Sequence, residues 1–241
     1  MCANYVPVTA GDELLQFFGV ERDFSSELPP ELYPTGMAPF IRLVNGTRAA
    51  EAGRFGLLPS WRREVSYGVN TYNSRCETID RLPSFKDSWK KGLRCIVPAK
   101  AVYEPRYNDD DTNERWRIEK ENGEPFGIAG IYSQRFENGL ECFSFSMVTV
   151  NCSDHPFYRQ FHAPGKEKRM PVFLEPEEYD AWMSCPLDDA ARYFRQWPGP
   201  FKGSPSPKTP RVPKAAKPAP PPKQPKPSPA AKPPPAQGDL F

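Results

Sequence analysis

The chain begins MCANY, with a cysteine directly after the initiator methionine. Methionine aminopeptidases remove Met1 when the second residue is small, so we expect the mature chain to begin at Cys2. Its α-amine and thiol then lie on adjacent carbons. Their ordinary pKa values, about 7.7–8.0 and about 8.5, leave both groups partly nucleophilic near neutral pH. One of six cysteines can also fall at position 2 by chance, so the rest of the sequence has to decide.

Four further segments combine polar residues with apolar and aromatic ones. They are FGLLPSW at 55–61, NSRCET at 73–78, RCIVPAKAVYEP at 94–105 and FHAPGKEKRMPVFL at 161–174. Together with the initial MC, and in this order, they resemble the motifs of the SRAP family, the SOS-response-associated peptidases. The resemblance covers residues 1–200, and a bacterial or phage host is expected from the C-terminal motif described below.

The resemblance implies a chemistry for Cys2. Members of the family link covalently to abasic sites in single-stranded DNA through the cysteine at position 2. The amine condenses with the ring-opened sugar aldehyde to an imine, and the thiol closes a thiazolidine ring in an intramolecular step. The crosslink shields the site during replication and the SOS response. The family also implies peptidase or hydrolase activity, self-removal of Met1 and lyase activity through the imine, with no cofactor.

Three matched positions carry implied catalytic roles. Glu104 is the general acid or base on the sugar oxygen and the imine, and Asn73 orients the terminal amine or thiol. His162 assists proton transfer and ranks above His155, which precedes a proline in a predicted turn. The alternatives are a surface carboxylate for Glu104, a turn residue for Asn73 and a structural role for the histidine.

The matched motifs also contain candidates for DNA binding. Arg75 is expected to contact a phosphate, which positions a strand without reading its sequence. Trp61 and Phe55 are expected to stack on bases, with packing in the core as the alternative. The remaining basic candidates, each with an ordinary solubilising role as the alternative, are Arg62, Arg63, Arg81, Lys86, Lys166, Lys168 and Arg169.

The sequence departs from the family pattern at three places. Ala3-Asn4 replaces the usual Gly-Arg, which removes a basic contact, and Pro105 replaces the usual tryptophan after Tyr-Glu. The loop from His162 to the Arg-Met-Pro motif is longer than the compact form of the family. The longer loop leaves the orientation of His162 open.

Composition separates a tail from the body of the chain. Residues 201–241 hold 14 of the 31 prolines, eight basic residues and one acid, which predicts a disordered tail after a single domain at 1–200. The tail ends in QGDLF, which resembles the pentapeptide that binds bacterial sliding clamps. Its predicted contact residues are Gln237, Asp239, Leu240 and Phe241.

The charge is unevenly distributed along the chain. The whole chain carries a net charge of +2, and the tail accounts for more than this, so the body is mildly acidic. Between Arg54 and Arg106, however, eleven basic residues face five acids. This asymmetry is compatible with one basic groove on the body.

The apolar patterns predict an α+β fold with a mainly antiparallel, barrel-like sheet and peripheral helices. A helix over 9–19 is predicted to begin at a Thr9 cap and to end at Gly19. Further helices are predicted over 84–92, 174–183 and 187–197. Strands are predicted over 39–46, 55–61, 94–104, 115–123, 126–132, 141–150 and 170–174.

The cysteines form no CxxC pair, and the chain has two histidines, so we expect no metal site. We expect no signal peptide and no membrane span, because the sequence has no leading apolar segment. The simplest expectation is therefore a cytoplasmic monomer at the nucleoid or replication fork, with reduced thiols.

Two other classes of function stay open. An N-terminal-nucleophile hydrolase, acting on peptides or amides, would also expose a cysteine after loss of Met1. A clamp-tethered DNA adaptor would use the tail alone and make Cys2 incidental. Loss of function in Cys2→Ala separates the adaptor from the two chemical hypotheses.

Overall fold

The structure is a computed structural model that describes residues 3–22 and 28–208. Its strands are β1 Asn4–Pro7, β2 Met37–Val44, β3 Thr47–Phe55, β4 Asn73–Arg75, β5 Arg94–Tyr107, β6 Asn113–Lys120, β7 Phe126–Glu137, β8 Leu140–Asn151, β9 Arg169–Pro171, β10 Phe173–Leu174 and β11 Phe201–Pro205. Its α-helices are α1 Gly11–Phe18, α2 Lys86–Lys90 and α3 Tyr179–Ser184. Its 3-10 helices are η1 Val65–Asn70, η2 Tyr158–Gln160, η3 Pro176–Glu178 and η4 Leu187–Tyr193.

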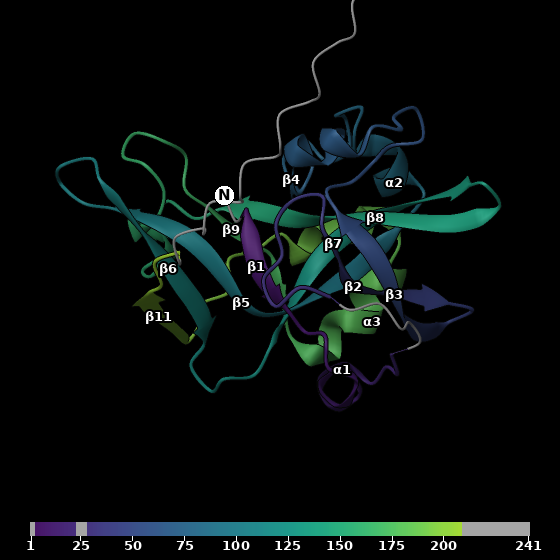
Figure 1. Cartoon of the computed structure of the whole chain (residues 1–241), viewed down its shortest axis with the longest axis horizontal. Helices are drawn as coiled ribbons and strands as arrows, with labels where there is room; N and C mark the ends of the chain where they lie inside the picture. The colour runs from purple at the N-terminus through teal and green to yellow at the C-terminus, as the bar shows by residue number, and fades with distance from the viewer. Residues whose placement is uncertain (1–2, 23–27, 209–241) are drawn as a thin grey trace, which may run out of the picture. The chain divides into compact units, whose positions relative to one another are not determined.

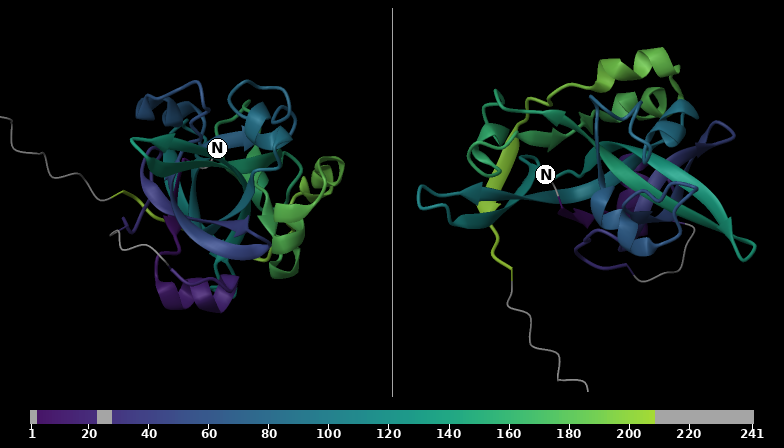
Figure 2. Two further views of the ribbon diagram at one scale, coloured as in Figure 1. Left: turned by 90° about the vertical axis from the view of Figure 1, so that its right-hand side faces the viewer. Right: turned by 90° about the horizontal axis from the view of Figure 1, so that it is seen from above.

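Five strands close into a barrel. β7 pairs with β8, β8 with β3, β3 with β2, β2 with β5, and β5 returns to β7. All these pairings are antiparallel except β3–β8. The ring is visible in the left view of Figure 2, with helices on its outside. The predicted α+β class with a barrel-like sheet is confirmed.

Aromatic side chains fill the barrel because alternate residues of each strand point inward. The ring of Phe40 lies 5.4 Å from that of Tyr132, 5.5 Å from Phe143 and 5.7 Å from Phe145. Phe40 and Phe145 are fully buried. Burial of each such side chain contributes about 1.5–3 kcal/mol, so the packed barrel is a rigid base for the strands that leave it.

The strand β5 is long enough to leave the barrel. Its first half pairs with β7, and its second half lies between β1 and β6. β6 in turn pairs with β11, so these strands form an arm beside the barrel (Figure 1). The strand predicted over 94–104 is confirmed and continues to Tyr107, which places Glu104 within the arm.

Two sequence predictions need correction. FGLLPSW is not a strand: β3 ends at Phe55, and Gly56 turns the chain with φ 113°. A side chain at Gly56 would clash with the backbone of Gly68, so only glycine fits this turn. At the other end of the body, β11 pairs with β6, so the folded body continues to Lys208 rather than ending at residue 200.

The three α-helices lie where the sequence predicts helices, with different ends, whereas the 3-10 helices η1 and η2 fall where no helix was predicted. α1 ends at Gly19, whose φ of 67° is the left-handed conformation typical of a helix end. Its N-cap is Ala10, without a side-chain hydrogen bond, rather than Thr9. The helix predicted over 187–197 is the 3-10 helix η4 and is shorter. No helix in the part of the chain that the structure describes is long and apolar enough to cross a membrane.

Candidate active site

Glu104 and His162 form a buried pair. The Glu104 side chain is fully buried and that of His162 is 7% exposed, and Nε2 of His162 lies 2.9 Å from Oε2 of Glu104. β5 supplies the glutamate, and the segment after η2 supplies the histidine. An acid and a base at this distance, shielded from water, can pass a proton to or from a reactant.

The backbone around His162 fixes the direction of its ring. His162 has φ 66°, a conformation that costs free energy for a residue with a side chain. Its N–H donates to the carbonyl of Pro105 at 2.8 Å, and its carbonyl accepts a hydrogen bond from Nζ of Lys168 at 2.7 Å. The longer loop of this chain therefore still directs His162 at Glu104, which answers the question that the sequence left open.

Asn73 and Arg75 share the short strand β4, which pairs in parallel with β8. Residues two apart in a strand point to the same face, so the two side chains lie on one side of β4. Asn73 is buried, and Arg75 is half-buried. Asn73 is therefore a strand residue and not the turn residue of the alternative interpretation.

A pocket of about 440 Å³ lies beside the Glu104–His162 pair. Its lining joins segments that are far apart in the sequence: Arg75, Pro105, Tyr107, His162, Ala163, Lys166, Glu167 and Arg169. Three of these residues are cationic, Arg75, Lys166 and Arg169, and one, Glu167, is a carboxylate. The pocket can hold an anionic group such as a phosphate next to a proton-transfer pair.

The first described residues lie beside this pair. β1 runs antiparallel to β5, with Asn4 opposite Tyr103 and Tyr5 opposite Val102. One step further along this register, Ala3 falls opposite Glu104. Cys2 itself lies outside the described residues.

The cysteines near the site are poor nucleophiles. Burial raises the pKa of the Cys152 thiol to about 12, and the charge of Glu104 adds to the increase. Burial and the charge of Glu77 raise the pKa of Cys76 to about 11. Both thiols are protonated at neutral pH, and a protonated thiol is neither a nucleophile nor a good metal ligand.

Arg169 is a buried structural residue, which corrects its prediction as a DNA contact. Its side chain is 1% exposed, and its guanidinium donates to both carboxylate oxygens of Glu77, at 3.1 and 2.8 Å. It also bonds Glu167 at 2.5 Å and the carbonyl of Thr149 at 2.6 Å. Through these hydrogen bonds Arg169 connects β9 to Glu77 and to Thr149 on β8.

The two aromatic candidates for base stacking, Phe55 and Trp61, differ in their exposure to solvent. Phe55 is fully buried, with its ring 5.2 Å from that of Tyr5, so the core interpretation holds and its face is closed to a base. Trp61 is 50% exposed. The guanidinium of Arg62 lies 5.2 Å from the ring centres of both Trp61 and Tyr67, an arrangement that keeps the indole at the surface.

The remaining basic candidates are spread over the surface. Lys168 is half-buried and donates to the carbonyls of His162 and Ala163. These hydrogen bonds stabilise the loop after His162 and engage the ammonium group that was predicted to bind a phosphate. Lys166 is exposed and lines the pocket. The others, exposed or half-buried and without a place in this pocket, are Arg62, Arg63, Arg81 and Lys86.

His155 is a structural residue. Its Nδ1 accepts hydrogen bonds from the N–H groups of Phe157 and Tyr158, at 3.1 and 3.0 Å, and its Nε2 lies 2.9 Å from the carbonyl of Trp197. Both ring nitrogens are occupied. Within residues 3–22 and 28–208 no cluster of three or more His, Cys, Asp or Glu side chains could hold a metal ion.

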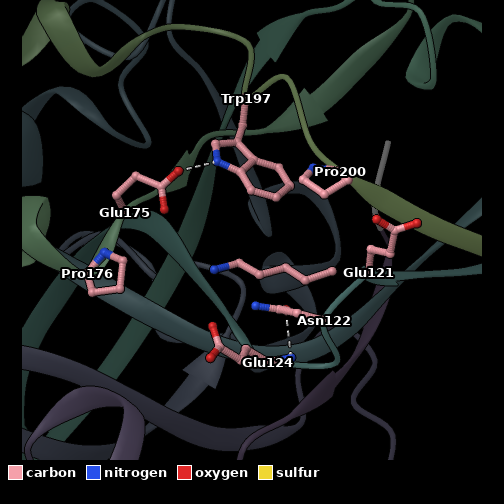
Figure 3. Close-up of a pocket in the computed structure, with 8 residues that line it drawn as sticks. Glu121, Asn122, Glu124, Glu175, Pro176, Trp197 and Pro200 are labelled. Carbon is pink, nitrogen blue, oxygen red and sulfur yellow. Dashed lines mark hydrogen bonds between the residues drawn. The ribbon is translucent and has the colours of Figure 1, made fainter.

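A second pocket, of about 330 Å³, lies at the far end of β6 (Figure 3). Nε1 of Trp197 donates to Glu175 at 2.6 Å across it. Lys120 in its lining is four residues along β6 from Trp116, the partner of Glu104, which is roughly 13 Å. Three glutamates line this pocket, so it repels phosphate and is separate from the candidate active site.

Comparison with known proteins places this geometry in a family. The sequence profile of the SRAP family, described as SOS response associated peptidase, matches residues 1–204. The chain belongs to the SRAP family. YoaM, named an abasic site processing protein, of Bacillus subtilis is 26% identical over 188 residues, 76% of this chain and 79% of that protein.

Other relatives and structures agree with this membership. The abasic site processing protein YoqW of Bacillus phage SPbeta is 24% identical over 76% of this chain and 80% of its own. A crystal structure of a protein from Bordetella bronchiseptica has 31% identity and a TM-score of 0.77, covering 85% of this chain and 99% of its own. One from Bacteroides thetaiotaomicron, with 22% identity and a TM-score of 0.69, covers 84% of this chain and 90% of its own and has the same fold.

The predicted site residues did not include Tyr107, Ala163 and Glu167, which line the pocket. Glu167 lies within the run KEKR, where alternating charges are typical of a solvated loop. In the structure it bonds Arg75, Arg169 and Asn151. The alternation was the only signal in the sequence, and it does not identify the partners.

Proposed function

We propose that this protein processes abasic sites in single-stranded DNA by forming a thiazolidine between Cys2 and the ring-opened sugar aldehyde. The observation that carries the proposal is the buried Glu104–His162 pair at 2.9 Å, beside the strand that leads to the N-terminus. Cys2 is the next residue along the chain from Ala3. The membership of the SRAP family and the names of the relatives support the same substrate.

The chemistry balances with one water lost. The α-amine of Cys2 adds to the aldehyde carbon, and the resulting hydroxyl must leave as water to give the imine. The thiolate then adds to the imine carbon, and the ring nitrogen takes up the proton. Glu104 and His162 supply and accept protons in these steps. Opening of the sugar ring also requires a proton transfer, at the ring oxygen.

The other thiols support the assignment to Cys2. Cys76 and Cys152, the cysteines beside the pocket, are held protonated by burial. An amine next to a thiol, which only the chain terminus has, is also required for the five-membered ring. Asn73 is proposed to orient this terminus from β4.

The DNA strand is proposed to pass over the pocket, with a phosphate at Arg75 and a base on Trp61. Arg75 lines the pocket with His162, and Trp61 presents half of its surface to solvent. Phosphate contacts give salt-dependent affinity, and stacking tolerates any base. Both contacts suit a protein that meets damage in any sequence.

Trp61→Ala is expected to weaken binding of intact single-stranded DNA by about tenfold, because stacking of a base on an aromatic ring contributes about 1–3 kcal/mol. Fluorescence anisotropy with a labelled oligonucleotide measures this change. Leu15→Ala is the control, since Leu15 is 54% exposed on α1. Equal affinities of the two variants would place the strand elsewhere.

We also propose that the tail binds a sliding clamp through QGDLF. Gln237, Asp239, Leu240 and Phe241 lie outside the described residues, so the motif and its basic, proline-rich linker carry this proposal. The linker would hold the domain near single-stranded DNA at a replication fork in the cytoplasm, with the protein as a monomer.

Deletion of residues 209–241 is expected to leave the crosslinking rate unchanged and to abolish clamp binding. The folded body ends before this segment, so chemistry and recruitment separate. Crosslinking is followed on denaturing gels, and clamp binding by surface plasmon resonance with the bacterial clamp. The matched control is the full chain with Leu240→Ala and Phe241→Ala; clamp binding by this variant would contradict the proposed motif.

Incubation with a single-stranded oligonucleotide that contains one abasic site tests the main proposal. A band that resists denaturation, and that needs the abasic site, is the expected result. A thiol hydrolase would instead cleave a peptide or amide substrate and leave the DNA free. The two hypotheses share Cys2 and differ in substrate.

A further inference from the structure

We propose that Glu167 occupies the phosphate position on Arg75 and thereby limits binding to undamaged DNA. The inference rests on the proposed function and adds a residue that determines specificity. Glu167 lies in the loop that lengthens the His162 motif in this chain. It is the one carboxylate among the residues that line the pocket.

The contacts of Glu167 connect the loop to three strands. Its Oε2 forms an ion pair with Nη2 of Arg75 on β4. Its Oε1 lies 2.5 Å from Nη1 of Arg169 on β9 and accepts a hydrogen bond from Asn151 at 3.2 Å. One carboxylate oxygen therefore contacts Arg75, and the other contacts Arg169 and Asn151.

A carboxylate and a phosphate present oxygen pairs of similar geometry to a guanidinium, so they compete for it. A phosphate that approaches Arg75 meets the charge of Glu167 at once. Binding of a strand therefore has to separate Arg75 from Glu167.

Separating Glu167 from Arg75 costs little free energy, because Glu167 keeps other hydrogen-bond partners. Glu167 keeps Arg169 and Asn151 as partners through its other oxygen. The loop is pinned at its base by Lys168, while Gly165, with φ 69°, lies at its exposed turn. Arg75 and Glu167 are 43% and 38% exposed, so their ion pair is partly screened by water.

Every DNA strand that binds has to break the ion pair between Arg75 and Glu167, and the free energy this costs favours abasic DNA over intact DNA. Intact DNA has only noncovalent contacts with which to meet this penalty, so its complex is weakened. An abasic strand adds a covalent bond through Cys2, and the penalty no longer decides its occupancy. Discrimination built on such an opposing contact is a general route to specificity.

The test is Glu167→Gln in the full chain, with a labelled intact single-stranded oligonucleotide and anisotropy as the readout. Affinity is expected to rise about fivefold, the factor that corresponds to loss of a partly exposed ion pair. Unchanged affinity, with crosslinking of abasic DNA intact, overturns this inference alone.

Two controls distinguish competition from a change in net charge. Glu77→Gln removes a neighbouring carboxylate that bonds Arg169 and not Arg75, and it is expected to raise affinity by less than twofold. In an Arg75→Gln background, Glu167→Gln is expected to add nothing. An equal gain from Glu77→Gln, or a gain that survives without Arg75, contradicts the proposal. Failure of every variant to form a crosslink with abasic DNA would instead count against the proposed function.

Discussion

Glu104→Gln is expected to slow formation of the abasic-site crosslink by about 100-fold, the lower end of what a positioned acid or base contributes. Glutamine has nearly the same shape, but it neither accepts nor supplies a proton at pH 7. Nε2 of His162, now 2.9 Å from the carboxylate, would face an amide instead. The proton transfers that release water from the first adduct would then fall to solvent.

Single-turnover gels with an abasic oligonucleotide measure this rate. Glu114→Gln is the matched control, because Glu114 is an exposed carboxylate on the neighbouring strand β6. His162→Gln should lower the rate as well, and the double variant should lose little more, because the two residues act as a pair. A rate for Glu104→Gln within threefold of the unmodified protein, with the fold intact, would remove Glu104 from the mechanism.

Cys2→Ala is expected to abolish the stable crosslink altogether. Alanine keeps the terminal amine, so it can still form an imine, but it has no thiol to close the ring. The imine returns to amine and aldehyde in water, and only a reducing agent such as cyanoborohydride would trap it. Loss of the stable product together with this trapped product separates the two steps of the reaction.

Cys142→Ala is the matched control for this experiment. Cys142 is a half-buried cysteine on β8, and its removal takes one thiol from the chain without touching the terminus. Full crosslinking is expected for this variant. A stable crosslink in Cys2→Ala would require another nucleophile and would contradict the assignment to the N-terminus.

The barrel strand β3 was not predicted, because its sequence TRAAEAGRF mixes charged and small residues and has no apolar run. The other four barrel strands were predictable because each contains an apolar run bounded by turn residues. Their pairing was not, since closure through β5–β7 and the parallel β3–β8 contact joins segments far apart in sequence. FGLLPSW has the composition of a strand, but the φ of 113° at Gly56 turns the chain there. β11 was hidden because a proline-rich segment does not resemble a strand, although its edge position next to β6 tolerates proline.

The site was predictable in part for a different reason. The motifs indicate Glu104, His162 and Arg75, and in the structure His162 and Arg75 line one pocket while Glu104 is buried 2.9 Å from His162. The partners of Arg169 could not be predicted from the sequence, because the residue type alone does not tell whether an arginine is buried or exposed. Phe55 shows the same limit: composition does not tell whether an aromatic ring stacks on a base or fills a barrel.

Thiazolidine formation at Cys2 is tested by the intact mass of the full chain before and after incubation with a single-stranded oligonucleotide that contains one abasic site. We expect a protein without Met1 and an adduct whose mass is the sum of protein and DNA less one water. We also expect borohydride to leave this adduct unchanged, since a thiazolidine has no imine to reduce. A protein that stays free while the abasic strand is intact, or an adduct that gains hydrogen on reduction, would contradict thiazolidine formation at Cys2.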